Sequence, residues 1–188
     1  MNHYVKFLVI SALFLFCSSF LLNSYAQEKK EEKVRISPKA GVMQVVGFTE
    51  VNIVYSRPGV KGRKIWDGLV PYNKVWRAGA NEATTISFGT DVTVEGKKLP
   101  AGKYGFFAIP SANEWTLIFN KVADQWGAFE YNEAQDILRI KVKPVKNNFN
   151  EWLAYTITKT GENKASIALE WENLKVPFNI TVPIDKKK

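Results

Sequence analysis

The chain has 188 residues and carries 26 Lys and Arg against 18 Asp and Glu, which gives a formal net charge of +8. Its one cysteine and one histidine, Cys17 and His3, both lie in an N-terminal segment that we expect to be removed. The remaining chain excludes disulfides, a cysteine nucleophile, a Ser-His-Asp triad and thiolate or imidazole metal sites. We therefore expect no metal and no cofactor, and any catalysis would rest on carboxylates, Lys, Tyr, Ser, Thr or the backbone.

Residues 1–26 have the organisation of a signal peptide. A lysine precedes the apolar run 7–16, which is too short to be a stable membrane span. Ser24-Tyr25-Ala26 then offers the small-x-small pattern that a signal peptidase cleaves. A phenylalanine stands before Cys17, where lipoprotein processing requires a small residue. The pattern predicts plain export to the periplasm or the cell exterior, with association with the outer membrane left open and no transmembrane segment after cleavage.

The rest of the chain is expected to form one domain between two charged ends. Residues 27–33 (QEKKEEK) are nearly free of apolar side chains, which is typical of a disordered linker. Residues 34–184 have a normal length for one hydrophobic core, and 185–188 form a basic tail. The positive charge favours anionic partners such as glycans or lipid headgroups. No nucleic-acid-binding motif accompanies that charge, so we expect no nucleic-acid partner.

Apolar residues alternate with polar ones through most of this domain, which is the pattern of half-buried strands. Turn residues such as Gly96-Lys97 and Gly161-Glu162-Asn163 separate the runs. The spacing predicts an all-β fold, an antiparallel β-sandwich of the jelly-roll or immunoglobulin-like kind with about nine or ten strands. The expected core positions are Val51, Ile53 and Tyr55; Ile86 and Phe88; Val92 and Val94; Trp115, Leu117 and Phe119; Leu138, Ile140 and Val142; Leu153, Tyr155 and Ile157; Ala165, Ile167, Leu169 and Trp171; and Val176, Phe178, Ile180 and Val182.

Two further elements are expected in this fold. Tyr104 follows the loop Leu99-Pro100-Ala101-Gly102-Lys103, from which it can return its hydroxyl to the loop backbone as a tyrosine corner. The segment 123–134 (ADQWGAFEYNEA) is weakly helical and contains a glycine. We expect at most one short helix there, crossing one end of the sheets.

The segment 57–82 is a long irregular loop without strand periodicity, and loops of that length in a compact domain are usually functional or disordered. It carries enough large apolar side chains to pack onto the domain. Its aromatic residues are interleaved with Arg and Lys, a combination that suits sugar faces and anions. The alternative is structural: Arg77 and Arg63 would clamp Asp67 or Glu82 to close the loop, and the tryptophans would be core.

The motifs of this loop and its surroundings resemble an exported bacterial family catalogued as domain of unknown function 2911. The resemblance covers about residues 36–183 and implies an all-β envelope domain, without an established activity, cofactor or catalytic residue. It is carried by YSRPGVKGR (55–63), VPY (70–72), WRAGANEAT (76–84), PAGKYG (100–105), Ile109-Pro110, Trp115 and Trp126-Gly127.

Three functions are compatible with these features. The first is a non-catalytic module that binds a glycan or another anionic ligand through the loop. The second is a structural or assembly protein of the envelope, and the third and weakest is a hydrolase that uses Asp67 and Glu82 as acid and base, whose carboxyls would have to lie about 5–9.5 Å apart. The residues expected to bind the ligand of the first are Arg57, Arg63, Trp66, Tyr72, Trp76, Arg77, Asn81 and Glu82.

Overall fold

The computed structural model describes residues 34–184. The expected signal peptide, the linker and the basic tail therefore lie outside the described residues. Within the described part, the chain folds into two antiparallel sheets, and no helix other than one 3-10 turn at Glu133–Gln135 is present. This confirms the predicted all-β sandwich and its number of strands, since there are ten.

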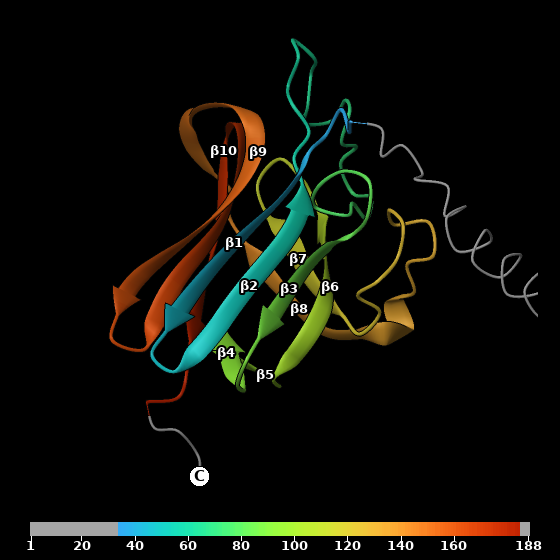
Figure 1. Cartoon of the computed structure of the whole chain (residues 1–188). Coiled ribbons are helices and arrows are strands. Elements are labelled where there is room, and N and C mark those ends of the chain that lie inside the picture. Colours follow the sequence, from blue (N-terminus) through green and yellow to red (C-terminus); the bar gives the residue numbers. More distant parts are fainter. Residues whose placement is uncertain (1–33, 185–188) are drawn as a thin grey trace, which may run out of the picture. The chain divides into compact units, whose positions relative to one another are not determined.

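The first sheet has six strands. Neighbouring strands in this sheet are also consecutive in the sequence, except that β3 pairs with β6. Figure 1 shows β1, β2 and β3 of this sheet side by side. Its strands, in spatial order, are β1 (Lys39–Val46), β2 (Thr49–Ser56), β3 (Thr84–Phe88), β6 (Gly102–Ile109), β7 (Trp115–Asn120) and β8 (Asp136–Val142).

The second sheet has four strands and is dominated by a long hairpin, seen at the left of Figure 1. The chain leaves the first sheet after β3, forms two short strands in the second, and returns through β6. The strands of this sheet, in spatial order, are β5 (Lys97–Leu99), β4 (Val92–Val94), β10 (Lys164–Thr181) and β9 (Val145–Gly161).

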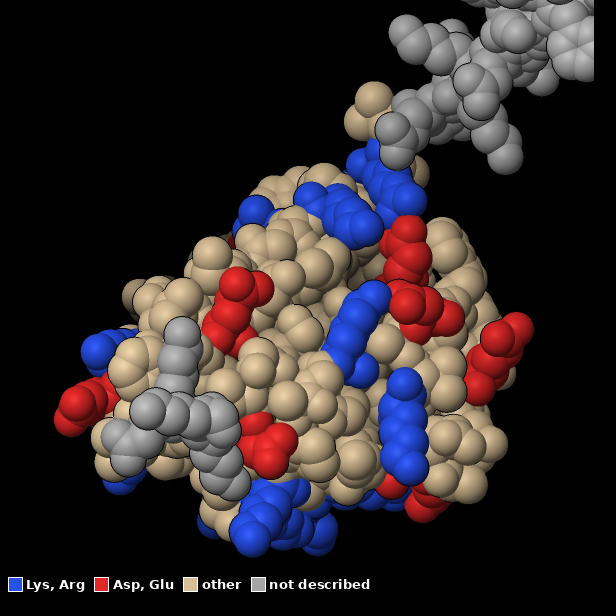
Figure 2. All heavy atoms as spheres, turned by 60° about the horizontal axis from the view of Figure 1, so that its bottom comes forward, with Lys and Arg blue, Asp and Glu red and all other residues tan. Residues whose placement is uncertain are grey.

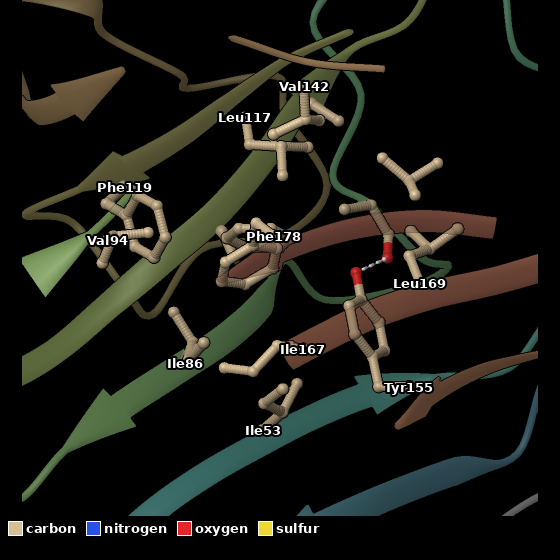
Figure 3. Packing of buried hydrophobic residues seen from close by; sticks show 14 of the residues in the cluster. Ile53, Ile86, Val94, Leu117, Phe119, Val142, Tyr155, Ile167, Leu169 and Phe178 are labelled. Carbon is tan, nitrogen blue, oxygen red and sulfur yellow. Dashed lines mark hydrogen bonds between the residues drawn. The ribbon is translucent and has the colours of Figure 1, made fainter. Parts of the chain in front are cut away.

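The core lies between the facing sides of the two sheets, as the period-two alternation requires. Ile53 of β2 and Ile86 of β3 are each 1% exposed, and Phe178 of β10 packs with them from the other sheet (Figure 3). Phe178 also contacts Phe106 and Phe119, with ring centroids 5.7 and 6.1 Å apart. Every expected core position lies in this cluster, either buried in it or, for Ile157, partly buried against it.

Two segments show details that the sequence pattern leaves open. The last two apolar runs form one strand, β10, which continues through a bulge at Glu172, where φ is +54°. The expectation of at most one short helix is confirmed, since the segment 123–134 runs into the 3-10 turn Glu133–Gln135. Before that turn the segment is irregular, and its backbone pairs with the end of the long loop. Ala83 donates to the Gln125 carbonyl (3.0 Å) and Gly127 donates to the Asn81 carbonyl (3.0 Å). The 3-10 turn that follows is short.

The tyrosine corner is confirmed. The Tyr104 hydroxyl donates to the Pro100 carbonyl at 2.7 Å and fixes the loop that enters β6. Of the helical segments described between residues 34 and 184, none has the length and apolar character needed to cross a membrane.

Candidate functional site

The loop 57–82 is fastened to the sandwich by its backbone. Val60 donates to the carbonyl of Glu151 on β9 (2.8 Å), and Trp76 exchanges two backbone hydrogen bonds with Ala108 on β6 (2.8 and 2.9 Å). Five of its non-glycine residues have positive φ: Lys61, Asp67, Asn73, Ala78 and Asn81. Left-handed corners of this kind let an irregular chain fold back on itself. The loop is therefore a compact, packed structure.

One of these corners lies at Ala78, which is fully buried and has φ of +50°. Its carbonyl accepts two hydrogen bonds, from Thr84 Oγ1 (3.0 Å) and from the Tyr155 hydroxyl (2.8 Å), the second drawn as a dashed line in Figure 3. Burial raises the pKa of Tyr155 well above its ordinary value, so this hydroxyl stays protonated and donates. Because alanine rarely adopts this conformation, the two donors hold the backbone on either side of it in place.

Four tryptophans connect the loop to the core. Trp66 lies edge-on to Trp115 and Trp171, with ring centroids 4.9 and 5.7 Å apart. Trp76 stacks on Trp171 at 6.0 Å, with an angle of 18° between the rings. Their indole nitrogens are used internally, since Trp66 donates to Glu172 and Trp76 donates to the Gly79 carbonyl (3.2 and 3.1 Å). The structural alternative therefore describes Trp66, whereas Trp76 also faces a hollow on the surface.

This hollow, here called the basic hollow, has a volume of about 530 Å³. Three of its lining residues are cationic, namely Lys61, Arg63 and Arg77, and none of its described lining residues is acidic. Aromatic surface comes from Phe129, which is 82% exposed, and from half-buried Trp76, whereas the lining residue Trp171 is only 1% exposed. A volume of this size lies within the range of about 300–1,000 Å³ typical of small-molecule sites.

Arg77 is the least satisfied polar residue of the basic hollow. It is half-buried, and its Nε is closed off from solvent without a hydrogen-bond partner among the described residues. Burial lowers the pKa of its guanidinium from the ordinary value, since no described carboxylate compensates for the lost solvation. Buried polar groups of folded proteins are nearly always paired, so an orphaned donor beside a hollow indicates a missing acceptor.

Gly127 makes room for this side chain. A Cβ at this position would lie 2.7 Å from Arg77 Nη1, and φ of Gly127 is +68°. Only glycine combines that backbone conformation with so close an approach. The segment expected to be a helix therefore serves as one wall of the hollow, with its backbone pressed against the guanidinium.

The arginine clamp of the structural alternative is not formed. Glu82 is paired with Arg35, whose Nη1 lies 2.7 and 2.8 Å from its two carboxylate oxygens. Arg63 donates instead to the carbonyls of Gly59 and Val60 (2.6 and 3.1 Å). Backbone hydrogen bonds already close the turns of this loop, so it needs no ion pair to remain shut.

The two candidate catalytic carboxylates occupy different surroundings. Asp67 is exposed in a tight turn, where its amide donates to the Val70 carbonyl (3.0 Å). Glu82 lines a second hollow, outside the basic one. Its partial burial would raise the pKa of Glu82, but hydrogen bonds from Arg35 and from its own amide, with the charges of Arg35 and Lys39, lower it below the ordinary value. Glu82 is thus held ionised, which does not suit a general acid.

The remaining predicted residues are divided between structure and site. Arg57 Nε donates to the Leu153 carbonyl (2.8 Å), away from the hollow. Asn81 lines the hollow and donates to the Ser37 carbonyl (3.1 Å), and half-buried Tyr72 is not among the lining residues.

The lining residues that sequence reasoning missed include Lys61, Phe129 and Trp171, which are cationic or aromatic. Lys61 was only one of many loop cations, and Trp171 alternates as a core position. Phe129 lies in the segment that was expected to be helical. The one signal in the sequence was that this segment carries aromatic residues that fit no strand or core pattern.

On the face shown in Figure 2, Lys and Arg residues are interspersed with Asp and Glu residues and separated by uncharged surface. Within residues 34–184 there is no group of three His, Cys, Asp or Glu side chains that could hold a metal ion.

The fold and the hollow together define an antiparallel β-sandwich whose long inter-strand loop carries a cationic, aromatic-walled cavity. Residues 37–180 match the model of a family described as a protein of unknown function, DUF2911. The chain belongs to that family, as its motifs indicated. No curated protein and no solved structure gives a significant match to the chain.

Proposed function

We propose that this protein is a non-catalytic binding module that holds an anionic ligand in the basic hollow. The ligand class is a glycan or a similar envelope component bearing carboxylate or phosphate groups. The observation that carries the proposal is Arg77, whose Nε is buried and unpaired beside a hollow with three cations and no described acidic residue. A carboxylate or phosphate oxygen would supply the acceptor that this donor lacks.

The neighbouring aromatic residues support a sugar-bearing anion over a bare ion. Phe129 is exposed at the hollow, and half-buried Trp76 also lines it. Cations interleaved with aromatic faces suit a ligand with both an anionic group and an apolar ring face. Neither Glu82 nor Asp67 lines the basic hollow, so neither carboxylate could act on a ligand held there.

Isothermal titration with hexagalacturonate and with its methyl-esterified counterpart tests this function. The charged oligomer should bind and the neutral ester should not, with an affinity that falls as salt rises. Arg77→Met should abolish binding, whereas Lys74→Met, which removes an exposed cation of the same loop outside the hollow, should not.

Inorganic phosphate, titrated in parallel, separates the two anion chemistries. Binding of phosphate but not hexagalacturonate would assign the hollow to phosphate groups. If neither probe binds, or if Arg77→Met binds as tightly as the parent, the proposed function is wrong.

The proposal includes export, which is supported by the pattern of residues 1–26. Fractionation of cells followed by N-terminal sequencing checks it, and the exported protein should begin at Gln27. An N-terminus at Met1 in the cytosolic fraction would contradict export, and the ligand could then not be an envelope component.

The second candidate is a structural or assembly role through protein contacts. It is favoured by β1, an edge strand with two exposed apolar side chains, Met43 (57%) and Val45 (50%). A photo-crosslinker at position 43 that captures one defined envelope protein in cells, together with failure of all anion binding, would favour this role.

A further inference from the structure

A second hollow lies on the outer face of the first sheet and is here called the sheet-face groove. Its floor includes Asn52 of β2 and Thr85 and Ser87 of β3, which alternate with the core residues of those strands. Its wall includes Gln125 and Trp126 from the segment after β7. The volume is about 580 Å³, again within the range of about 300–1,000 Å³ for ligand sites.

Several polar side chains of this groove are left without partners. The side chains of Asn52, Thr85 and Ser87 are half-buried and form no hydrogen bond within the described residues. Gln125 is only 8% exposed, and its Oε1 is buried with no donor, although its Nε2 donates to the Val122 carbonyl (2.9 Å). A buried acceptor of this kind is rare in folded proteins and calls for a ligand or water to satisfy it.

An aromatic face accompanies these polar groups. Trp126 is 58% exposed, although tryptophan is usually among the more buried residue types. Its backbone is fixed by a bridge to Glu82, so the exposed indole stands on an ordered segment. Tryptophan combines a large apolar face with an N–H donor, which favours ligands that are apolar on one side and hydroxylated at the edges. Pyranose rings have this character.

The charges around the groove cancel one another. Two lining cations, Lys39 and Lys103, face two lining carboxylates, Glu82 and Asp124. Lys103 lies 2.6 Å from Asp124, and Glu82 is paired with Arg35. This differs from the basic hollow, whose described lining has three cations and no acidic residue.

We infer that the sheet-face groove is a second binding site, which takes a short neutral oligosaccharide. Trp126 would stack on a sugar ring, while Asn52, Thr85, Ser87 and Gln125 would exchange hydrogen bonds with its hydroxyl groups. The inference does not depend on the proposed function, because the two hollows share no charged lining residue.

The test is to titrate the purified protein with three neutral probes, cellohexaose, laminarihexaose and maltohexaose. Binding is measured by calorimetry and by ¹H–¹⁵N spectra. At least one should bind and shift the Trp126 indole signal and the side-chain amide signals of Asn52 and Gln125. Trp126→Ala should weaken that binding roughly tenfold or more, as loss of a central aromatic anchor does.

The matched control is Trp152→Ala, which removes another exposed indole (38%) that lies outside the groove. It should leave neutral-sugar binding unchanged, and so should Arg77→Met. Asn52→Ala should weaken binding without changing the melting temperature, since this side chain has no protein partner. The inference is overturned if none of the three oligosaccharides binds at millimolar concentration, or if binding survives Trp126→Ala in full.

Discussion

Replacing Arg77 by methionine should stabilise the protein. An unsatisfied buried hydrogen-bond donor costs about 1–3 kcal/mol, and Arg77 Nε is such a donor. Because the residue is only half-buried and lines the hollow, we expect the lower end of that range. Methionine keeps an unbranched stem of similar length, so packing is largely retained. The free energy of unfolding should rise by about 1 kcal/mol and the melting temperature by roughly 2–4 °C.

The same substitution at Arg63 gives a control of opposite sign. Its guanidinium donates to two backbone carbonyls at 2.6 and 3.1 Å, and hydrogen bonds from charged groups contribute more than neutral ones. Arg63→Met should therefore lower the free energy of unfolding by about 1 kcal/mol. Thermal melts followed by circular dichroism, with urea titrations to check that the m-value is unchanged, measure both. If Arg77→Met lowers the melting temperature as much as Arg63→Met, Arg77 has a structural partner and the reasoning fails.

Three further predictions concern the surroundings of the site. Tyr155→Phe and Thr84→Val each remove one of the two donors to the Ala78 carbonyl. In urea titrations the double variant should lose about 0.5–3 kcal/mol more free energy of unfolding than the two single variants together. Additive losses would refute the shared acceptor. Gly127→Ala should cost more than about 1 kcal/mol and weaken hexagalacturonate binding, because φ is +68° and the methyl group would meet a guanidinium; unchanged binding would show that this wall does not position it. Glu82 has a lowered pKa beside Arg35. Its contribution to the free energy of unfolding is therefore present above the unfolded pKa of about 4.3 and is lost as the pH falls through the folded pKa. Glu82→Gln should reduce this loss of stability at acid pH by less than about 1 kcal/mol in urea titrations at different pH values, since both partners are partly exposed.

The β-sandwich could be predicted because burial imposes a period of two on every strand with one face in the core. Ile53, Ile86 and Phe178 occupy core positions for that reason. β1 gave no such pattern, since it is an edge strand with exposed Met43 and Val45. The bulge at Glu172 could not be predicted either. Two alternating runs joined by an irregular residue have the same sequence pattern whether or not the strand continues through that residue.

The candidate site could be located in the sequence but not assembled from it. The length and composition of the loop 57–82 indicated where to look, and Trp76, Arg77 and Asn81 do line the basic hollow. The opposite wall comes from Phe129, which is distant in sequence and is brought there by backbone pairing between Gly127 and Asn81. Long-range pairing of irregular segments has no periodic signature. Charge pairing was also unpredictable, since it depends on which side chains meet in space.

The way the loop is fastened explains why cations remain available in it. A long loop loses much conformational entropy on ordering, and side-chain ion pairs could have offset that cost. Here backbone hydrogen bonds to β6 and β9, the Ala78 carbonyl network and the stacked Trp76 perform that task. The guanidinium of Arg77 is then positioned by the fold without being neutralised by it. A cation held in that way lowers the stability of the free protein. A destabilising residue of this kind is retained when it serves binding, because the bound ligand supplies the missing hydrogen bond.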